Sequence, residues 1–349
     1  MLVIEGLRAR VGSFELSDIA LKVKGGGYLV LMGPTGSGKT TLLNVIAGLL
    51  KPLSGRVELD GHDITGLPPE KRPIGYVFQD CRLFPHLTVR ENVAFGPRAR
   101  GIRGEELEER VRWALEVVGA EELADKRPGQ LSGGEARKAA LARALALKPR
   151  LLLLDEPLAH VDERTREELL DRLREIKEEL RPIVIHVTHN RLEALKLADQ
   201  LALMSSGRLV QAGEVGSVLS KPVSSFAAKF LGYENILRGV CRREGGLFEL
   251  EVGSVKLFAA EGREGEVLVC LRAEDIFLSR EEPRTSARNV LKGRVVSLEP
   301  RGPLIGVRLE VGPDIELTSV ITPAAKEELR IDVGADVFLA FKASSVRVI

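Results

Sequence analysis

Residues 28–40 read Tyr-Leu-Val-Leu-Met-Gly-Pro-Thr-Gly-Ser-Gly-Lys-Thr, and this stretch decides the fold. Its first five residues are apolar, which predicts a strand buried on both faces of a parallel sheet. The next eight match a phosphate-binding loop, and residues 41–47 have helical spacing up to Gly48. A strand, a glycine-rich loop and a helix in this order predict an α/β fold that binds a nucleoside triphosphate.

The loop offers several kinds of phosphate contact. Its glycines let backbone N–H groups turn toward a polyphosphate at the positive end of a helix dipole. Lys39 would place a cation against the β- and γ-phosphates, and the Thr40 hydroxyl is the expected ligand of Mg²⁺. We therefore predict ATP and Mg²⁺ as cofactors. The predicted nucleotide-binding residues are Gly33, Pro34, Thr35, Gly36, Ser37, Gly38, Lys39, Thr40 and Thr41.

A second apolar run, the four leucines of residues 151–154, ends in Asp155 and Glu156. Ligands of open parallel sheets lie at the carboxyl ends of the strands. We expect Asp155 to hold Mg²⁺, directly or through water, and Glu156 to orient and deprotonate the attacking water. An acidic pair is also ordinary at a helix N-terminus. The phosphate loop upstream makes that second interpretation the weaker one.

A third apolar run covers residues 182–188 and leads to His189, a candidate γ-phosphate contact at another strand end. His186 lies inside this run and is predicted to be a core residue.

Residues 131–135 read Leu-Ser-Gly-Gly-Glu, and we call them the signature segment. Ser132 and Glu135 have the spacing of a capping box at a helix start. A capping box does not explain the two glycines, each of which costs about 1 kcal/mol relative to alanine. Glycine would let the helix start approach a phosphate closely. Because residues 33–40 already form a complete loop, we predict that the ATP of a second subunit is bound by Ser132, Gly133, Gly134 and Glu135.

Together with Gln79 and Asp162, these motifs resemble the ATP-binding subunit of ABC transporters over residues 1 to about 230. The resemblance implies a head-to-tail homodimer with two ATP molecules between the phosphate loop of one subunit and the signature segment of the other. It implies that Gln79 senses Mg²⁺ and couples to a membrane partner, and that Asp162 crosses the dimer interface. The predicted catalytic residues are Glu156, His189 and Gln79, and the predicted metal ligands are Thr40, Gln79 and Asp155.

The resemblance also implies partners: two integral-membrane permease subunits and, indirectly, a substrate-binding protein. The chain would then be peripheral, on the cytoplasmic side of the cell membrane. Four positions depart from the family pattern. Glu135 stands where Gln is commoner, Lys138 where Arg is usual, and the loop before Asp162 lacks the usual Ser and Leu. Val11 occupies the position of an adenine-stacking aromatic, with Phe14 three residues away.

Composition agrees with this class. The 51 basic and 50 acidic residues of the 349 leave a net charge of +1, which favours no nucleic-acid partner. No apolar run reaches the eighteen residues of a membrane span. The three cysteines are scattered singly, so neither a metal site nor a disulfide framework is indicated. A soluble ABC ATPase that acts on DNA or ribosomes would need coiled-coil insertions or basic stretches, and the sequence has neither.

Several glycines and prolines divide residues from about 85 to 150 into short pieces, which we predict to form a helical subdomain. Within and beside it, Phe84, Leu87 and Phe95 could form an apolar patch that receives a helix of the permease. They could equally be core residues beneath a loop. The resemblance favours docking.

The tail contains a repeat. Asn235-Ile-Leu-Arg-Gly and Asn289-Val-Leu-Lys-Gly open two stretches of short alternating strands. We predict an α/β P-loop ATPase domain over residues 1–230, followed by an all-β regulatory domain over residues 231–349. Two OB-like barrels would make up this second domain, at about 232–282 and 283–349.

The second barrel resembles small molybdate/tungstate-binding modules, which implies a tetrahedral oxyanion held between barrels. The candidate ligands are Ser286, Arg288, Lys342, Ser344 and Ser345. The first barrel has Glu274-Asp275 where the second has two serines, and carboxylates would repel such an anion. A purely structural tail that sets the dimer geometry is the alternative.

These observations lead to one functional prediction. We predict the energy-coupling ATPase subunit of an importer for molybdate or tungstate, with a tail that senses the oxyanion and inhibits transport. The alternative is an importer of sugar, sulfate or ferric iron whose tail is structural or binds a regulatory protein.

Overall fold

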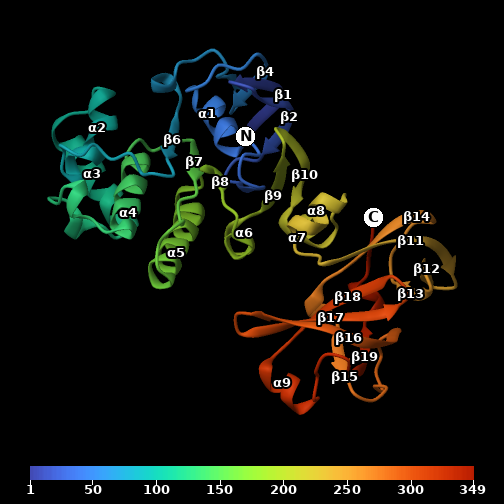
Figure 1. The fold of residues 1–349 in the computed structure, drawn as a ribbon. Helices are drawn as coiled ribbons and strands as arrows, with labels where there is room; N and C mark the ends of the chain where they lie inside the picture. Colours follow the sequence, from blue (N-terminus) through green and yellow to red (C-terminus); the bar gives the residue numbers. More distant parts are fainter. The chain divides into compact units, whose positions relative to one another are not determined.

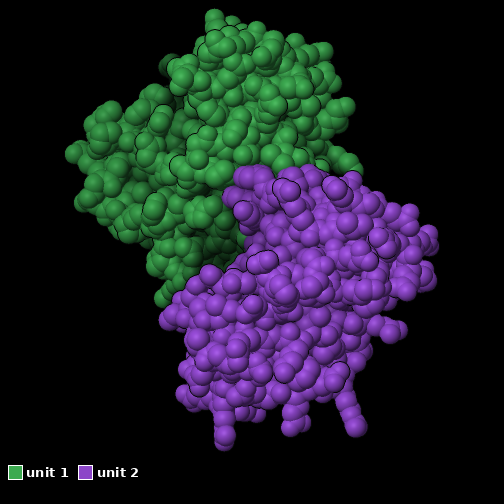
Figure 2. All heavy atoms as spheres, turned by 45° about the vertical axis from the view of Figure 1, so that its right-hand side comes forward, with its two compact units in different colours: residues 1–218 green, residues 219–349 purple.

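The computed structural model describes residues 1–349. The chain divides into two compact units, Met1–Val218 and Leu219–Ile349, which are coloured separately in Figure 2. The division falls within helix α7 (Val215–Ser220), before the boundary near residue 230 that the sequence indicates. Helix α8 (Ser225–Phe230) therefore belongs to the second unit. No helix of the chain combines the length and the apolar composition that crossing a bilayer requires.

A six-stranded sheet forms the centre of the first unit, in the order β10-β9-β3-β8-β7-β6. All neighbours are parallel except the edge pair β10 and β9. Every residue of β3, β7 and β8 is buried, as the three apolar runs predict. The strands are β3 (Tyr28–Met32), β6 (Ile74–Val77), β7 (Leu151–Asp155), β8 (Ile183–Val187), β9 (Gln200–Ser205) and β10 (Arg208–Glu214).

A second, antiparallel sheet of the first unit has the order β2-β1-β4-β5. Helix α1 (Lys39–Ala47) shares one hydrophobic core with this sheet and with the central sheet, so both sheets fix its position. The fully buried Arg72 donates to the carbonyls of Val45 and Ile46 and so satisfies the last turn of α1. The strands are β1 (Leu2–Val11), β2 (Phe14–Val23), β4 (Ser54–Leu59) and β5 (His62–Asp63).

Helices α2 (Val89–Ala99), α3 (Gly104–Val118) and α4 (Gly133–Leu145) pack against one another between β6 and β7 in the chain, and Figure 1 shows them as a separate group beside the sheet. The five apolar residues on one face of α3 are all buried: Leu107, Val111, Ala114, Leu115 and Val118. Helix α5 (Glu163–Leu180) connects β7 to β8, and α6 (Arg191–Leu197) connects β8 to β9.

The second unit contains two five-stranded sheets, β13-β12-β11-β14-β20 and β15-β19-β16-β17-β18. Strand β15 follows β14 in the chain but pairs with β19, and β20 follows β19 but pairs with β14. Each half thus contributes its last strand to the sheet of the other half, and one core joins them. The elements are β11 (Asn235–Glu244), β12 (Leu247–Val252), β13 (Val255–Ala259), β14 (Gly265–Leu271), β15 (Phe277–Ser279), β16 (Asn289–Arg301), β17 (Leu304–Gly312), β18 (Ile315–Ile321), α9 (Pro323–Glu328), β19 (Asp336–Phe341) and β20 (Arg347–Val348).

The asparagines that open the two repeats make equivalent bonds. Asn235 accepts from the backbone N–H of Thr318 at 2.6 Å and donates to its carbonyl at 2.9 Å. Asn289 accepts from the N–H of Phe258 at 2.6 Å and donates to its carbonyl at 3.0 Å. Both side chains are buried, and each satisfies a backbone pair in the opposite half. The repeated asparagine therefore joins the two halves.

Candidate nucleotide site

The predicted phosphate loop runs from the carboxyl end of β3 to the start of α1. The Nζ of Lys39 donates to the carbonyls of Gly33 and Pro34, both at 2.9 Å, and lies 3.3 Å from the Ser37 hydroxyl. Burial lowers the pKa of Lys39, and the carboxylates of Glu156 and Asp155 oppose this shift. The ammonium group is thus held over the loop by carbonyls that a phosphate oxygen could replace as its partner.

Two glycines of the loop are required by the protein's own packing. A Cβ at Gly33 would lie 2.1 Å from the carbonyl oxygen of Met204. Gly38 has φ 101°, and a Cβ there would lie 2.7 Å from the Cζ of Phe14. Phe14 is therefore packed against the loop, whereas Val11 is 51% exposed at the end of its strand. These are the two positions that the sequence leaves open for adenine stacking.

The acidic end of the site is adjacent to this loop. Asp155 ends β7 and is 3% exposed. Burial raises the pKa of its carboxyl group and Glu156 adds to the rise, while a hydrogen bond with Thr40 and the charge of Lys39 oppose it. Thr40 and Asp155 thus meet although 114 positions separate them, and their hydroxyl and carboxylate oxygens are the donors that Mg²⁺ prefers.

The three predicted catalytic residues also come together. The Oε2 of Glu156 accepts from the Nε2 of Gln79 at 3.2 Å, and its Oε1 lies 3.8 Å from the Nδ1 of His189. Glu156 has φ 48°, a left-handed conformation that is uncommon for a residue with a side chain. Its backbone N–H donates to the carbonyl of Val187, the last residue of β8. The strained backbone places the candidate base between the ends of two strands.

Arg137 is a residue of this site that the sequence analysis missed. It lies on α4, is 8% exposed, and its Nη1 is 3.3 Å from both the carbonyl of Gln79 and the carbonyl of Glu156. The signal was its spacing, because Arg137 stands three and seven residues before Ala140 and Ala144, which line the buried face of α4. One buried guanidinium thus links the helix that follows the signature segment to the segments of Gln79 and Glu156.

The signature segment forms the predicted capping box. Ser132 accepts from the N–H of Glu135, and Glu135 accepts from the N–H of Ser132. The Nζ of Lys126 lies 2.8 Å from Oε1 of Glu135, and this bond together with the Ser132 backbone lowers the pKa of Glu135 to about 2. No hydrogen bond or ion pair joins the segment to the phosphate loop of the same chain.

The two signature glycines differ in their surroundings. A Cβ at Gly134 would lie 2.5 Å from the Cγ2 of Thr165 on α5, so packing within the subunit already requires glycine there. At Gly133 the nearest neighbour would be the carbonyl of His160 at 3.8 Å, which leaves open space. Close approach by a phosphate is therefore not needed to explain Gly134. Gly133 is the glycine that faces free space.

His186 lies in the core as predicted, fully buried, with its Nδ1 2.9 Å from the hydroxyl of Tyr28. Asp162 accepts from the N–H and the hydroxyl of Thr165 and so forms the N-cap of α5. These bonds lower the pKa of Asp162. A hollow of about 120 Å³ lies beside the candidate base and is lined by Glu156, Leu158, Ala159, His160, Arg166, Thr188, His189, Asn190 and Glu193.

The predicted docking patch borders a groove of about 370 Å³. Phe84 and Phe95 both line it, with ring centroids 4.5 Å apart, and Phe95 is 49% exposed. Phe95 is therefore not a core residue, while Leu87 is half-buried and outside the groove. Arg143 donates to the carbonyls of Cys81 and Arg82 and so fixes the preceding loop.

The oxyanion candidates are less convergent. Ser286, Arg288, Lys342 and Ser344 are exposed, and no hydrogen bond connects them. Ser345 is half-buried and forms a side-chain hydrogen bond with Asp275, whose pKa is raised by burial and by Glu274. The two segments that differ between the repeats therefore lie side by side, and a carboxylate occupies one donor of the candidate anion site.

Comparisons with known proteins agree with the geometry of the first unit. A family model described as ABC transporter matches residues 16–159, and a TOBE domain model matches residues 285–348. The molybdate/tungstate import ATP-binding protein of Pyrococcus abyssi is 42% identical over 348 residues, which covers 100% of this chain and of that protein. The chain belongs to the family of ABC transporter ATP-binding proteins. The protein of the same description from Pyrococcus horikoshii is 43% identical, with 100% and 99% covered.

Similar proteins described with other cargoes also match the chain. The spermidine/putrescine import ATP-binding protein of Thermotoga maritima is 42% identical over 287 residues, which covers 80% of this chain and 78% of that protein. Among solved structures, a nucleotide-free ATP-binding cassette from an ABC transporter has a TM-score of 0.59 at 29% identity and covers 64% of this chain and 96% of its own. A dimeric post-hydrolysis cassette with ADP and Pi has a TM-score of 0.56 at 31% identity, with 62% and 99% covered. The predicted ATPase fold is confirmed.

Proposed function

We propose that this chain is the ATP-hydrolysing, energy-coupling subunit of an ABC importer for molybdate or tungstate. The observation that carries the enzymatic part is the meeting of Lys39, Thr40, Asp155 and Glu156 at the carboxyl edge of one parallel sheet. The cargo rests on relatives described as molybdate/tungstate import ATP-binding proteins that match the chain from end to end.

Hydrolysis would depend on a change of hydrogen-bond partner at Lys39 and on a proton transfer to Glu156. Lys39 would give up the carbonyls of Gly33 and Pro34 for the β- and γ-phosphate oxygens, whose negative charge makes the new hydrogen bonds stronger. Glu156 would take a proton from the attacking water as the water oxygen bonds to the γ-phosphorus and the bond from that phosphorus to the bridging oxygen breaks, so that ADP and phosphate are released. Gln79 would hold the other oxygen of the Glu156 carboxylate. His189, 72% exposed beside Glu156, is free to contact the γ-phosphate.

The oxygen donors fit a magnesium ion. The Thr40 hydroxyl and the Asp155 carboxylate would hold Mg²⁺, with the Gln79 side chain as the third candidate. When bound, Mg²⁺ would neutralise part of the charge that develops on the phosphates. The raised pKa of Asp155 fits this assignment, because a cation would stabilise a carboxylate that burial otherwise disfavours.

Two partner surfaces follow from the same proposal. The signature segment, with open space at Gly133, would contact the ATP of a second copy in a homodimer. The groove lined by Phe84 and Phe95 would receive a helix of one of two permease subunits. The chain would thus lie peripherally on the cytoplasmic side of the membrane, with the substrate-binding protein acting on the permease.

The tail is proposed to bind the imported oxyanion and to inhibit transport. A TOBE domain model covers residues 285–348, where all five candidates lie. Lys342 and Arg288 supply positive charge and three serines supply hydroxyl donors, which suits a dianion with no proton of its own. Because Ser345 is bonded to Asp275, binding would require that pair to separate.

Measurements of ATP turnover test the enzymatic part of the proposal. The purified chain should hydrolyse Mg·ATP, and Glu156→Gln should lower turnover by about 10²–10⁴-fold while ATP binding is retained. The matched control is Glu179→Gln, an exposed acid of α5 without a partner, which should change nothing. Undiminished turnover in Glu156→Gln would remove Glu156 as the base.

The cargo is tested in cells. In Thermococcus kodakarensis, whose molybdate/tungstate import ATP-binding protein is 42% identical over 300 residues, this chain would replace the relative. Tungsten and molybdenum contents measured by mass spectrometry should be restored by the chain and not by its Glu156→Gln variant. Calorimetry of the full chain with molybdate, tungstate, sulfate and maltose then tests the tail. If the strain with this chain and the strain with its Glu156→Gln variant had equal tungsten and molybdenum contents, although the permease co-purifies with the chain, the proposed cargo would be rejected.

A further inference from the structure

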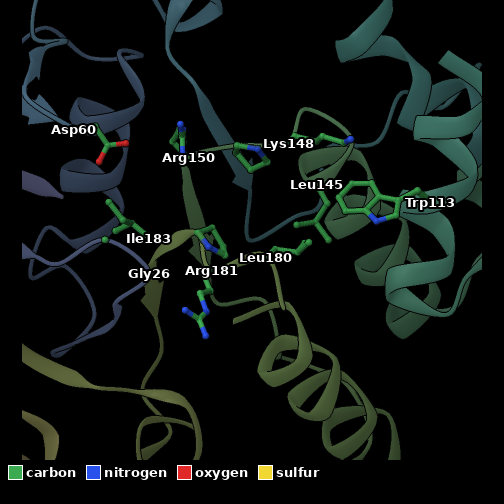
Figure 3. Close-up of a pocket in the computed structure, with 12 residues that line it drawn as sticks. Gly26, Asp60, Trp113, Leu145, Lys148, Arg150, Leu180, Arg181 and Ile183 are labelled. Atoms are coloured by element: carbon green, nitrogen blue, oxygen red, sulfur yellow. The ribbon is translucent and has the colours of Figure 1, made fainter. Parts of the chain in front are cut away.

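A pocket of about 460 Å³ lies at the edge of the central sheet opposite the candidate nucleotide site. It is lined by residues that immediately precede β7 and β8, by the turn before β3, and by the last turns of α4 and α5 (Figure 3). Its volume falls within the range of about 300–1,000 Å³ that small-molecule sites occupy. Nothing in the proposed reaction uses this pocket.

The walls of the pocket are apolar. Trp113 of α3, the only tryptophan of the chain, lies beside Leu145 on one side, and Ile183 lies on the opposite side (Figure 3). Leu180, the last residue of α5, is 40% exposed at the rim. A flat or hydrocarbon body would find the indole ring and several aliphatic side chains to contact.

Three cations surround these walls. Lys148, Arg150 and Arg181 are exposed, and none of them forms an ion pair with a carboxylate. Lys148 instead holds its Nζ 5.5 Å from the centre of the Trp113 ring. The acid of the pocket, Asp60, is already paired with the amino group of Met1. In a chain with nearly equal numbers of basic and acidic residues, three cations without a carboxylate partner at one pocket favour an anionic ligand there.

Two of these cations are also in an unusual backbone conformation. Lys148 follows α4 with φ 45°, and Arg181 follows α5 with φ 47°. Glycine adopts this conformation with less strain than any residue with a side chain, yet both positions carry a basic residue.

We propose that this pocket binds a small amphipathic organic anion, one with a flat apolar body and a phosphate, sulfonate or carboxylate group. The body would lie against Trp113, Leu145 and Ile183, and the acidic group would face Arg150 and Arg181. A simple inorganic anion would not use the apolar walls. The ligand would contact both the helical group α2–α4 and the central sheet. It would lie at the C-terminal ends of α4, which begins at the signature segment, and of α5, which begins at Asp162.

The test uses the full chain and the fluorescence of Trp113. Anilinonaphthalene sulfonate serves as the probe anion, and the uncharged phenylnaphthylamine as its match. Because Trp113 is the only tryptophan, quenching of its fluorescence reports binding at this pocket. We expect the quenching to saturate at one probe per chain. The double variant Arg150→Ala/Arg181→Ala should weaken binding by about tenfold or more, as the loss of charge-assisted contacts requires. The uncharged match should bind at least about tenfold more weakly than the sulfonate.

The control is Arg103→Ala/Arg208→Ala, which removes two exposed arginines without ion-pair partners from the same unit. It should bind the probe as the unmodified chain does. Circular dichroism establishes that both double variants are folded. Absence of quenching, or equal affinity in the two double variants, would overturn the proposal, as would equal affinity for the charged and the uncharged probe.

Discussion

The two units of this chain bring distant residues together for different purposes. In the first, Gln79 and His189 come from separate segments and lie 3.2 Å and 3.8 Å from the carboxylate of Glu156, with Lys39 and Asp155 nearby. In the second, distant residues also meet, but the most precise contacts are those of the two repeated asparagines, which join the halves. Four of the five anion candidates there are exposed, and the fifth, Ser345, is half-buried.

The difference shows how much each kind of fold supports a site. A parallel sheet gathers the ends of all its strands at one edge, so residues that follow different strands become neighbours without further arrangement. A duplicated antiparallel unit has no such shared edge. Its repeats place equivalent residues at equivalent positions, and equivalence alone does not bring unlike ligands together.

The largest expected effect is that of Lys39→Met, which tests whether the residues that meet in the first unit form a binding site. If Lys39 binds phosphate as proposed, removing this buried cation should weaken ATP binding by about 2–5 kcal/mol. Equilibrium titration with a fluorescent ATP analogue measures this loss. Lys51→Met, which removes an exposed lysine, is the control and should bind as the unmodified chain does. Equal binding by both variants would mean that the loop does not hold the phosphates.

The second effect concerns the joint between the repeats. Asn289→Ala leaves the part-buried N–H and carbonyl of Phe258 without their side-chain partner, which should cost the second unit about 2 kcal/mol of unfolding free energy. Because Trp113 lies in the first unit, tryptophan fluorescence reports that unit, while circular dichroism reports both. In urea we expect a shift in the circular dichroism transition alone, and a similar shift for Asn235→Ala. A shift in fluorescence instead would contradict the division.

Arg137→Met is expected to have a smaller effect, on turnover. The variant keeps the apolar stem of the side chain but loses the two contacts that hold the carbonyls of Gln79 and Glu156. We expect kcat to fall about tenfold, or 1.4 kcal/mol, with little change in KM for ATP. Lys138→Met changes the neighbouring cation of α4, which contacts Glu168 instead, and should leave kcat unchanged. A rise in KM without a loss of kcat would show that Arg137 acts on binding.

The smallest effect is a pH dependence at the signature segment. The pKa of Glu135 is lowered to about 2 in the folded chain, against about 4.3 in an unfolded one. Its contribution is therefore present above pH 4.3 and is lost as the pH falls toward 2. Above pH 5 the chain should melt at a higher temperature than the Glu135→Gln variant, a difference that corresponds to less than about 1 kcal/mol of unfolding free energy. The two melting temperatures should become equal near pH 2. A gap that stays constant would show that Lys126 does not stabilise the ionised form.

Contiguous motifs made much of the first unit predictable. The runs before the phosphate loop and before Asp155 are buried strands, and Ser132 with Glu135 forms the expected capping box, since each of these depends on neighbouring residues. Arg137 was missed because a charged residue on a helix is ordinarily exposed. Its burial depends on two loops that only the folded chain brings to it.

The second unit was less predictable for a related reason. Alternating residues identify short strands but not their partners, and the exchange of β15 and β20 between the sheets is a matter of pairing alone. The contact of Asp275 with Ser345 follows from that exchange, so it could not be anticipated from either repeat alone.

The exchanged strands also affect the order in which the tail can mature during synthesis. Strand β14 ends at Leu271, yet its outer neighbour β20 begins only at Arg347. A nascent chain would therefore leave the edge of β14 uncovered while more than seventy further residues are translated. During that interval the exposed edge of β14 could pair with other chains. Aggregation in the cell should therefore depend on how quickly residues 272–346, between β14 and β20, are translated.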